Sequence, residues 1–470
     1  MSTHDTALPA GLAPLLDILP PQAWSREGDE IAPLSADWRG RYRGHSPILF
    51  KPSTLDEVKA IVAACHHHKI AITPQGGNTG LVGGSTPQGE VLLSLKRMNQ
   101  IQAVDPINDS LTCEAGAILE TIQNHAAKAH RLFPLSLGSQ GSAMIGGLIS
   151  TNAGGVHVLR YGMMRDLVLG LQAVLPDGSV IDDLSGLRKN NTGYDLKQLL
   201  IGAEGTLGVI TAATLKLFAR PASRAVALLG VATPHNAVDL LARMKELTGG
   251  GVCAFELMPW RALELVTQHV PGTRLPFESS HPWCVLMEVT SGEAERAEIL
   301  MQAGLEDGFE RGLIEDGVIA QSQAQMAQFW GLRESIPEGE KAHGKAAKHD
   351  ISVPVSRMAD FLTQVTPKVE AMVPGAQIVA FGHVGDGNAH YNLTRQAPGA
   401  EEDFIEACKD ATAFIYDQVD HYGGSISAEH GIGILKRQEL ADRYPERVSV
   451  MKAIKATLDP HGIMNPRILL

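Results

Sequence analysis

The sequence is poor in cysteine, in aromatic residues and in positive charge. Its five cysteines are scattered and none forms a CxxC pair, which is the usual ligand pattern of an iron–sulfur cluster. Lysine and arginine number 40 against 52 acidic residues, and the net charge of −12 argues against nucleic acid or an anionic membrane surface as a partner. No apolar run is long enough to cross a bilayer, and the N-terminus lacks the basic start of a signal peptide. These absences predict a reduced, cytoplasmic chain with no transmembrane segment.

Two common nucleotide-binding motifs are also missing. No strand leads into a helix through GxGxxG, and no Gly-Lys-Ser/Thr marks a Walker A loop. Glycine is nevertheless abundant, with 48 residues, and much of it gathers in three clusters at 74–85, 137–155 and 201–211. Loops of this kind present consecutive backbone N–H groups to an anion and let a flat cofactor lie against the main chain. The glycine clusters therefore predict a large cofactor bound by backbone.

Strands and helices alternate along the chain, and Pro221 marks a change in their order. Before it, short apolar strands surround the glycine clusters. After it, strands alternate with amphipathic helices, which suggests a sheet covered on one side by helices. Helical stretches are expected from Ser322 to about Lys345, interrupted at Pro337, and from Glu402 to Asp420. We predict an α+β fold with an N-terminal extension at 1–45, a cofactor domain at 46–222, a substrate domain at 223–425 and a C-terminal segment at 426–470.

The C-terminal part carries a pattern typical of a metal site. His383 and His390 stand at an odd spacing, which on an unbroken strand would point them to opposite faces. The intervening residues 385–388 read Gly-Asp-Gly-Asn, so we expect a turn that brings both imidazoles to one side. Glu429 and His430 follow farther on. Two histidines and one carboxylate suit a catalytic divalent metal, and we predict His383, His390 and Glu429 as ligands. His430 is the candidate base, because its ordinary pKa lies near the working pH.

Six motifs occur in order along the chain: PQGGNTGLVGGS, IGGLISTNAGG, YGMMRDLV, NNTGYDLKQLLIGAEGTLGVIT, FGHVGDGNAHYN and SAEHGIG. As a set they resemble the flavin-dependent 2-hydroxy acid dehydrogenases of the vanillyl-alcohol-oxidase flavoprotein superfamily. The strongest likeness is to the D-2-hydroxyglutarate and D-lactate dehydrogenases and to the flavin subunit of glycolate oxidase. The resemblance extends from about residue 45 to residue 468.

The resemblance implies a particular fold and cofactor. The cofactor domain would consist of two α+β subdomains that bind FAD, followed by an α+β substrate (cap) domain and a helical C-terminal segment. FAD would be bound non-covalently, with His157 and Cys113 as the nearest residues for a covalent link. The residues that would contact FAD belong to the three glycine clusters: Pro74, Gln75, Gly76, Gly77, Asn78, Thr79, Gly80, Leu81, Gly83, Gly84, Ser85, Gly138, Ser139, Gly146, Gly147, Thr151, Asn152, Gly154, Gly155, Glu204, Gly205, Thr206, Gly208 and Ile210.

The same resemblance assigns further catalytic roles. Zinc or a similar ion would occupy the histidine site. Arg333 and Lys348 would grip the substrate carboxylate, and Asn392 would hydrogen-bond the substrate or the metal. Two positions depart from the family pattern. Pro337 stands where the resemblance to enzymes acting on hydroxyglutarate would predict threonine. Residues 465–468 read Asn-Pro-Arg-Ile, whereas the family usually has Asn-Pro-Gly-Lys.

The predicted reaction combines the flavin and the metal. A 2-hydroxy acid loses a hydride from its Cα atom and a proton from its hydroxyl group, and flavin N5 would accept the hydride. The resemblance favours D-2-hydroxyglutarate as the substrate and 2-oxoglutarate as the product. The electrons would pass to an electron-transfer flavoprotein, a quinone or another acceptor other than NAD, and the chain could form a homodimer.

Three alternatives stay open. The substrate could be D-lactate or D-malate, with the same mechanism in a smaller pocket. The chain could be the flavin subunit of a glycolate-oxidase-like complex, whose iron–sulfur clusters a separate partner would carry. A different class is a metal-dependent hydrolase whose glycine-rich domain merely binds a nucleotide.

Overall fold

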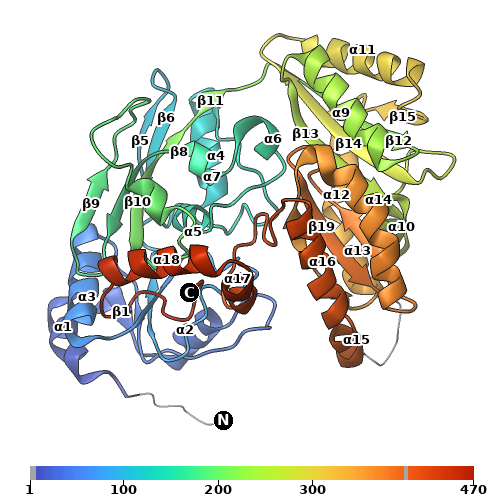
Figure 1. Ribbon diagram of the computed structural model, residues 1–470. Helices are drawn as coiled ribbons and strands as arrows, with labels where there is room; N and C mark the ends of the chain where they lie inside the picture. Colours follow the sequence, from blue (N-terminus) through green and yellow to red (C-terminus); the bar gives the residue numbers. More distant parts are fainter. Residues whose placement is uncertain (1–6, 396–400) are drawn as a thin grey trace. The chain divides into compact units, whose positions relative to one another are not determined.

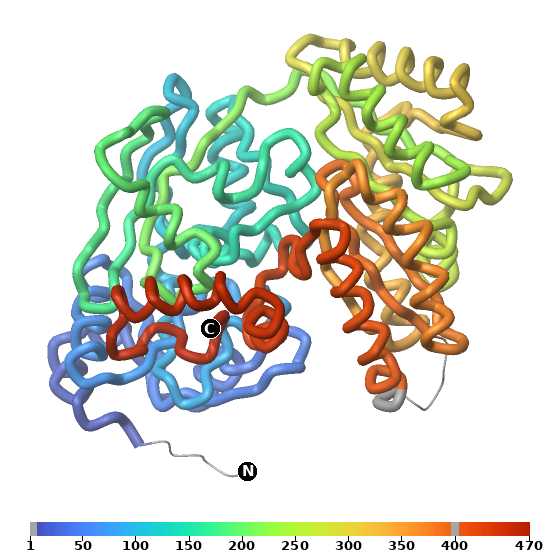
Figure 2. The backbone as a smooth tube through the Cα atoms, viewed as in Figure 1, coloured from blue at the N-terminus to red at the C-terminus, as the bar shows by residue number. Residues whose placement is uncertain are grey.

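The structure, a computed structural model, describes residues 7–395 and 401–470 and divides into two compact units (Figure 1, Figure 2). The first unit comprises Met1–Gly155, Gly162–Arg220 and Glu429–Leu470. The second unit comprises Val156–Tyr161 and Pro221–Ala428. Residues 1–6 of the predicted N-terminal extension lie outside the described residues.

Two larger sheets form the framework of the first unit. One has the order β1 (Trp24–Ser25), β2 (Leu49–Phe50), β4 (Val91–Ser94) and β3 (Ile72–Gln75), with β2 and β3 parallel to β4. The other is antiparallel and has the order β5 (Ile101–Asp105), β6 (Ser110–Glu114), β10 (Val209–Lys216), β8 (Val168–Val174) and β9 (Val180–Asp183). A small antiparallel pair, β7 (Arg131–Leu132) with β11 (Phe218–Ala219), completes the described strands of this unit.

Helix α3 (Leu55–His68) shows how local sequence sets helix ends in the first unit. Thr54 caps its N-terminus by accepting the N–H of Glu57 at 3.2 Å. Lys69 ends the helix in a left-handed conformation with a φ of 53°. The other α-helices described in this unit are α1 (Ala13–Ile18), α2 (Gly28–Ile31), α4 (Leu119–Lys128), α5 (Ile145–Ser150), α7 (Met164–Leu167), α8 (Lys197–Leu200), α17 (Arg437–Arg443) and α18 (Pro445–Leu458).

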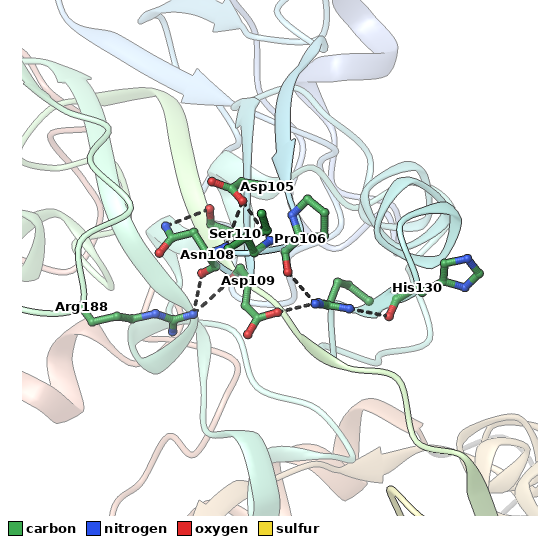
Figure 3. A network of polar contacts seen from close by, with 9 residues as sticks. Asp105, Pro106, Asn108, Asp109, Ser110, His130 and Arg188 are labelled. Carbon is green, nitrogen blue, oxygen red and sulfur yellow. Dashed lines mark hydrogen bonds and ion pairs between the residues drawn. The ribbon is translucent and has the colours of Figure 1, made fainter.

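The turn between β5 and β6 is fixed by its own polar side chains (Figure 3). The Asp105 carboxylate accepts the N–H groups of Ile107 and Asn108, at 3.0 and 2.9 Å. Asp109 follows with a φ of 49°, and its carboxylate accepts Arg131 Nε at 2.5 Å. Short polar side chains that bond nearby backbone are typical of tight turns. The network therefore orders the hairpin.

The C-terminal residues return to the first unit and extend its first sheet. Ile72 donates its N–H to the Ile463 oxygen at 2.7 Å, and Asn465 donates its N–H to the Ile72 oxygen at 2.9 Å. This alternation is typical of a parallel bridge, which here joins Ile72 to Met464. Glu429 and His430 consequently belong to the same unit as the glycine clusters.

One sheet of the second unit is buried on both faces. It is antiparallel, with the order β13 (Val252–Pro259), β14 (Trp283–Ser291), β12 (Ser223–Val231) and β15 (Asp316–Ile319). Val226 and Leu228 share a core with helices α10 (Trp260–His269) and α12 (Gln323–Glu334). Helices α9 (Pro234–Thr248) and α11 (Arg296–Glu310) also pack on these strands, and Leu229 and Leu305 of α11 both lie close to Gly317. The expected one-sided cover is thus corrected, because strands apolar at nearly every position are typical of burial on both faces.

The other sheet of the second unit is built around β19 (Asn388–Thr394). Strands β16 (Ala346–Ala347), β17 (Asp350–Ser352) and β18 (Gln377–Phe381) all pair antiparallel with it. Helix α14 (Val355–Met372) packs on β18 and on α16 (Lys409–His421). The two sheets of the unit meet at an antiparallel bridge, in which Leu257 and Gly382 each donate an N–H to the other at 3.0 Å. This bridge brings β13 to the turn between β18 and β19.

The first predicted helical stretch is interrupted near Pro337, as expected, and the second, predicted as one long helix, is also divided. The first forms α12 and α13 (Ile336–His343), which meet at Ser335. Pro337 lies in the first turn of α13, where backbone N–H groups have no acceptor within the helix, so the N–H that proline lacks is not needed there. The second forms α15 (Glu401–Ala407) and α16. Among the described helices, none combines the length and the apolar character needed to cross a membrane.

Candidate active site

A cavity in the first unit is lined by all three glycine clusters. The first cluster contributes the end of β3 and the loop after it, the second contributes α5, and the third contributes residues before and at the start of β10. The residues predicted to contact FAD that line this cavity are Pro74, Gln75, Gly76, Gly77, Asn78, Thr79, Gly80, Gly84, Ser85, Gly146, Gly147, Thr151, Glu204, Gly205, Gly208 and Ile210.

The remaining predicted FAD contacts are not among the lining residues: Leu81, Gly83, Gly138, Ser139, Asn152, Gly154, Gly155 and Thr206. Two of them show a structural reason. The Asn152 carboxamide oxygen accepts the N–H of Arg165 at 2.8 Å, and the Thr206 hydroxyl donates to the Ala203 oxygen at 2.7 Å. These two side chains form hydrogen bonds with nearby backbone groups. Some residues of the glycine-rich motifs therefore stabilise the loops and do not line the cavity.

Sequence reasoning also missed several lining residues, namely Val82, Leu95, Ala115, Met144, Leu148, Ser150 and Val209. Most are ordinary buried apolar residues between or beside the glycines, and nothing in their type distinguishes a cavity wall from a core. Five of them lie inside the clusters, and that position was the only available signal, whereas Leu95 and Ala115 lie outside the clusters.

The cavity suits a flat cofactor that approaches the main chain. A Cβ atom at Gly147 would meet no other residue's atom within 4 Å, so a side chain there would enter the cavity. A Cβ atom at Gly77 would lie 2.2 Å from the Ser142 oxygen, so that glycine permits close packing of two loops. Side chains are absent where a broad, flat group would lie, and the residues present therefore fit FAD.

His430 lines the same cavity, and hydrogen bonds to Glu204 hold the loop that carries it. The Glu204 carboxylate accepts the N–H groups of Ile432 and Gly433, both at 2.8 Å. Burial raises the pKa of Glu204, although these two hydrogen bonds act in the opposite direction. Asn465 donates its side-chain N–H to the backbone oxygen of Glu204 at 2.8 Å. The third glycine cluster, the His430 loop and the C-terminal end thus meet at one buried carboxylate.

In the second unit, the turn between β18 and β19 brings two of the predicted metal ligands together. The ring centroids of His383 and His390 lie 5.9 Å apart, which confirms that the turn places both imidazoles on one side. Gly387 in this turn has a φ of 88°, and a Cβ atom there would lie 2.2 Å from the Val353 oxygen. Only glycine fits that position without displacing the backbone.

A buried carboxylate, Glu256 of β13, connects His383 to Arg333. Its Oε1 atom accepts a hydrogen bond from His383 Nδ1, and its Oε2 atom accepts one from Arg333 Nε at 2.5 Å. Burial opposes ionisation of Glu256, but the charges of His383 and Arg333 outweigh it and hold its pKa at about 2. The Arg333 guanidinium also lies 4.9 Å from the Phe381 ring centroid. Arg333 is therefore a buried, fixed group and not a surface residue.

A second buried carboxylate, Glu340 of α13, joins the other two predicted substrate-binding residues. Lys348 Nζ lies 2.9 Å from Glu340 Oε2, and the Asn392 side-chain nitrogen lies 3.0 Å from both carboxylate oxygens. Glu340 is 1% exposed. Lys348 and Asn392 therefore come together around a glutamate that sequence reasoning did not single out.

Of the two glutamates, Glu256 could have been found from its sequence context. Glu256 interrupts the apolar run Val252–Met258, where a fully buried acid is rare unless a partner neutralises it. Glu340 offers a weaker signal, because a glutamate on a helix is ordinary.

The donor set around His390 suits a divalent metal ion. Asp350 lies directly opposite His390 in the β17–β19 ladder, and ligand atoms of the two residues lie within 4.8 Å of each other. With His383 nearby, two imidazoles and a carboxylate form the kind of set that zinc accepts. Sequence reasoning did not select Asp350 as a ligand. Glu429 is a residue of the first unit, and its part in the ligand set stays a prediction.

The two residues considered for a covalent flavin link have other surroundings. Cys113 is fully buried in β6, and burial raises the pKa of its thiol far above the ordinary value. His157 belongs to the second unit, where its Nε2 atom lies 3.7 Å from Glu288 Oε1. Neither lines the glycine cavity.

Several solved structures have a similar fold. An alkyldihydroxyacetonephosphate synthase matches with a TM-score of 0.74 and 17% identity, over 99% of this chain and 87% of that one. A p-cresol methylhydroxylase matches with a TM-score of 0.75 and 17% identity, over 97% and 95%. At this identity the likeness shows the fold alone, which is that of the vanillyl-alcohol-oxidase-type flavoproteins, as predicted.

Sequence comparison then gives the family. A model described as "FAD binding domain" matches residues 46–183, and one described as "FAD linked oxidases, C-terminal domain" matches residues 220–469. The chain belongs to the FAD-linked oxidase family and is an FAD-dependent oxidoreductase. The alternative of a metal-dependent hydrolase is therefore wrong.

Named relatives share most of the chain. The D-2-hydroxyglutarate dehydrogenase of Bos taurus is 40% identical, covering 93% of this chain and 79% of the relative. A Schizosaccharomyces pombe protein, provisionally named as a D-lactate dehydrogenase, is 39% identical, covering 94% and 85%. The D-2-hydroxyglutarate–pyruvate transhydrogenase of Saccharomyces cerevisiae is 35% identical, covering 94% and 90%.

The prediction of a cytoplasmic chain is contradicted by these names. The Bos taurus and Schizosaccharomyces pombe relatives are named as mitochondrial proteins, as is the D-2-hydroxyglutarate dehydrogenase of Danio rerio. The five cysteines on which that prediction rested are buried and form no disulfide, a pattern that does not distinguish one compartment from another.

Proposed function

We propose that the chain oxidises D-2-hydroxyglutarate to 2-oxoglutarate, with bound FAD as the hydride acceptor. The observation that carries the proposal is that His430, the predicted base, lines the glycine cavity that fits FAD. The substrate is supported by relatives from Bos taurus and Danio rerio, which are named D-2-hydroxyglutarate dehydrogenases and are 40% and 39% identical to this chain.

The chain's own residues divide the work of the reaction. FAD in the cavity supplies the hydride acceptor. His430 accepts the hydroxyl proton through a ring nitrogen, because a neutral imidazole is a base suited to neutral pH. Arg333 and Lys348 provide positive charge for the substrate's carboxylates, and each is held in place by a buried glutamate.

A divalent ion, with zinc as the expected metal, forms the second part of the proposal. His383 and His390 would hold it, together with Asp350 or the predicted ligand Glu429. Such an ion would supply Lewis-acid polarisation of the substrate hydroxyl. The support is the donor set of the second unit and the carboxylate behind His383, a pattern that is common for metal-binding histidines.

The electron acceptor is proposed to be a protein or a quinone and not NAD. Support comes from the absence of a GxGxxG motif in the sequence. An electron-transfer flavoprotein or the iron–sulfur partner of a glycolate-oxidase-like complex would serve, and a homodimer is compatible with either.

D-lactate is the second candidate substrate. Pro337 has no side-chain hydroxyl at a position where the family resemblance predicts threonine for hydroxyglutarate, and one relative is provisionally named as a D-lactate dehydrogenase.

Anaerobic reduction of the bound flavin tests the proposal. The purified chain is mixed separately with D-2-hydroxyglutarate, D-lactate and D-malate, with the L-enantiomers as controls. Fast loss of flavin absorbance with D-2-hydroxyglutarate alone supports the leading substrate. Loss with D-lactate or D-malate instead transfers the assignment to the smaller acid, and no loss with any of them rejects both.

A further inference from the structure

Glu256 lies where an acidic side chain is least expected. It occupies the middle of β13 and is 0% exposed, and its neighbours Phe255 and Leu257 are both buried. A lone carboxylate in such surroundings is strongly unfavourable unless charged or hydrogen-bonding partners compensate for its lost hydration. The position therefore calls for an explanation in terms of its partners.

The two oxygen atoms of Glu256 bind two residues that the proposed function uses differently. Oε1 binds His383, a proposed metal ligand, and Oε2 binds Arg333, a proposed substrate cation. The contact to His383 is 127 positions away in sequence, and the contact to Arg333 is 77 positions away. The backbone bridge between Leu257 and Gly382 fixes this arrangement, because each partner of the bridge is next to one member of the Glu256–His383 pair.

The hydrogen bond determines which atom of His383 can act as a metal ligand. Oε2 of the same carboxylate accepts the Arg333 guanidinium, so Glu256 acts as an acceptor and His383 Nδ1 donates its hydrogen to Oε1. In the neutral imidazole, the lone pair then lies on Nε2, and the ring is held against rotation.

The same carboxylate orients Arg333. Its Nε atom is bound to Glu256, and its guanidinium plane lies over Phe381, two residues before His383. The Nη edge of the guanidinium is consequently the one presented to a substrate carboxylate.

We propose that Glu256 is a positioning residue, whose single buried carboxylate fixes both the metal-binding orientation of His383 and the substrate-binding orientation of Arg333. The inference rests on the proposed function, because it takes from it the roles of His383 and Arg333. It goes beyond that function by assigning to one residue the coupling between the metal and the substrate carboxylate.

Glu288 offers a matched control on the neighbouring strand β14. It is 3% exposed and also binds one arginine and one histidine: Arg224 Nη2 lies 2.5 Å from Oε2, and His157 Nε2 lies 3.7 Å from Oε1. Its carboxylate also accepts hydrogen bonds from Trp330 Nε1 at 2.9 Å and from Cys253 Sγ at 3.3 Å. None of these partners is a proposed metal or substrate ligand. Glu288→Gln therefore removes a buried charge that contacts neither His383 nor Arg333.

The experiment compares Glu256→Gln, Glu256→Asp and Glu288→Gln in the full-length, FAD-loaded chain. Each protein is first stripped of metal by a chelator and then titrated with Zn²⁺ in competition with a chelating dye, while KM and kcat are measured separately with D-2-hydroxyglutarate. Glu256→Gln is expected to weaken Zn²⁺ binding by about 10- to 100-fold and to raise KM, with unchanged FAD content. A carboxylate offers one acceptor oxygen to His383 and one to Arg333. Glutamine has one oxygen and one NH2 group, so the NH2 group would face one of the two donors and that hydrogen bond would be lost.

Glu256→Asp separates the two effects and covers the case in which Glu256→Gln does not fold. Aspartate keeps the charge but is one methylene shorter, so it can reach only one partner well, and either Zn²⁺ affinity or KM should change while the other stays near wild type. Glu288→Gln should change neither.

Several results would overturn the proposal. They are wild-type Zn²⁺ affinity and KM in both Glu256 variants, an equal loss of Zn²⁺ binding in Glu288→Gln, or a wild-type chain that binds no Zn²⁺. If the wild-type flavin is not reduced by the acid but Zn²⁺ affinity still follows the expected order, the proposed substrate is wrong and the role of Glu256 toward His383 stands.

Discussion

The glycine cavity of the first unit and the histidine turn of the second unit place their functional groups by different means. Around the cavity, the backbone forms the surface, and Gly147 leaves space where a side chain would intrude. Around the histidines, buried carboxylates such as Glu256 and Glu340 fix the polar groups. A flat cofactor is recognised over a wide area by shape, whereas a metal and a small acid need a few groups at fixed angles.

This difference predicts how each region responds to a larger side chain, to the loss of a charge and to pH. A site made by backbone is sensitive to added volume and largely insensitive to charge. A site made by carboxylates is sensitive to the loss of one charge and to pH. The first unit also contains one exception, Glu204, which holds the His430 loop by two backbone N–H groups.

The largest effect is expected from Gly147→Val. The new side chain would enter the cavity because nothing else occupies that direction, so the purified protein should contain no FAD. Flavin absorbance per protein measures this directly. Gly138→Val is the matched control: its Cβ atom also meets no neighbour, but Gly138 does not line the cavity. Full flavin content in Gly147→Val would show that the cavity is not the FAD site, and flavin loss in Gly138→Val would restore that residue to it.

His430→Ala should lower kcat by about 10²–10⁴-fold while FAD stays bound, because the proton acceptor is removed and the glycine backbone is not. Rapid-mixing measurement of flavin reduction provides the rate. His67→Ala, an exposed histidine in the last turn of α3, should leave the rate unchanged. Reduction by the His430 variant at the wild-type rate would remove this residue from the mechanism.

Glu288→Gln and Glu204→Gln should affect stability with opposite dependence on pH. Burial raises the pKa of Glu288, but His157 and Arg224 outweigh it and lower the value from 4.5 to about 2. Its ionised form therefore stabilises the fold above about pH 4.5, and this contribution, on the order of 3 kcal/mol, is lost as pH falls toward 2.

For Glu204 the sign is reversed. Its pKa is raised by burial, so its stabilising contribution is present below the ordinary value of 4.5 and is lost as pH rises through the raised value. Urea unfolding of each variant and of the wild type across acidic and neutral pH measures both trends. In Glu288→Gln the deficit relative to wild type should grow with pH, and in Glu204→Gln it should shrink. Parallel trends in the two variants would contradict the assignment.

The smallest effects are expected away from both sites, at the helix N-caps. Thr54→Ala in the first unit and Ser322→Ala in the second each remove a side-chain acceptor of a backbone N–H at 3.2 Å. Each should lower the free energy of unfolding by about 1 kcal/mol, with little effect on FAD content or KM. Denaturant unfolding measures the loss. A large change in KM for Ser322→Ala would mean that the N-terminal cap of α12 affects the position of Arg333 at the other end of the same helix. The cap would then contribute to the histidine site and not to stability alone.

Local chemistry made much of the fold predictable. The Pro176–Gly178 turn between two apolar runs predicts the hairpin of β8 and β9, and the structure contains it. Thr54 with an acidic first turn predicts the start of α3. The turn at residues 385–388 predicts the approach of His383 to His390. Each of these interactions depends on residues close together in sequence.

The sequence by itself determined the class of cofactor, the α+β fold and most of the cavity lining, because glycine clusters and turn residues act through their own backbone. Only the tertiary structure decided which carboxylates support the site. Glu256 meets His383 across 127 positions, and Glu204 meets Ile432 across 228. Such pairs depend on how sheets and loops meet, and no short-range spacing along the chain encodes a contact between residues so far apart in sequence.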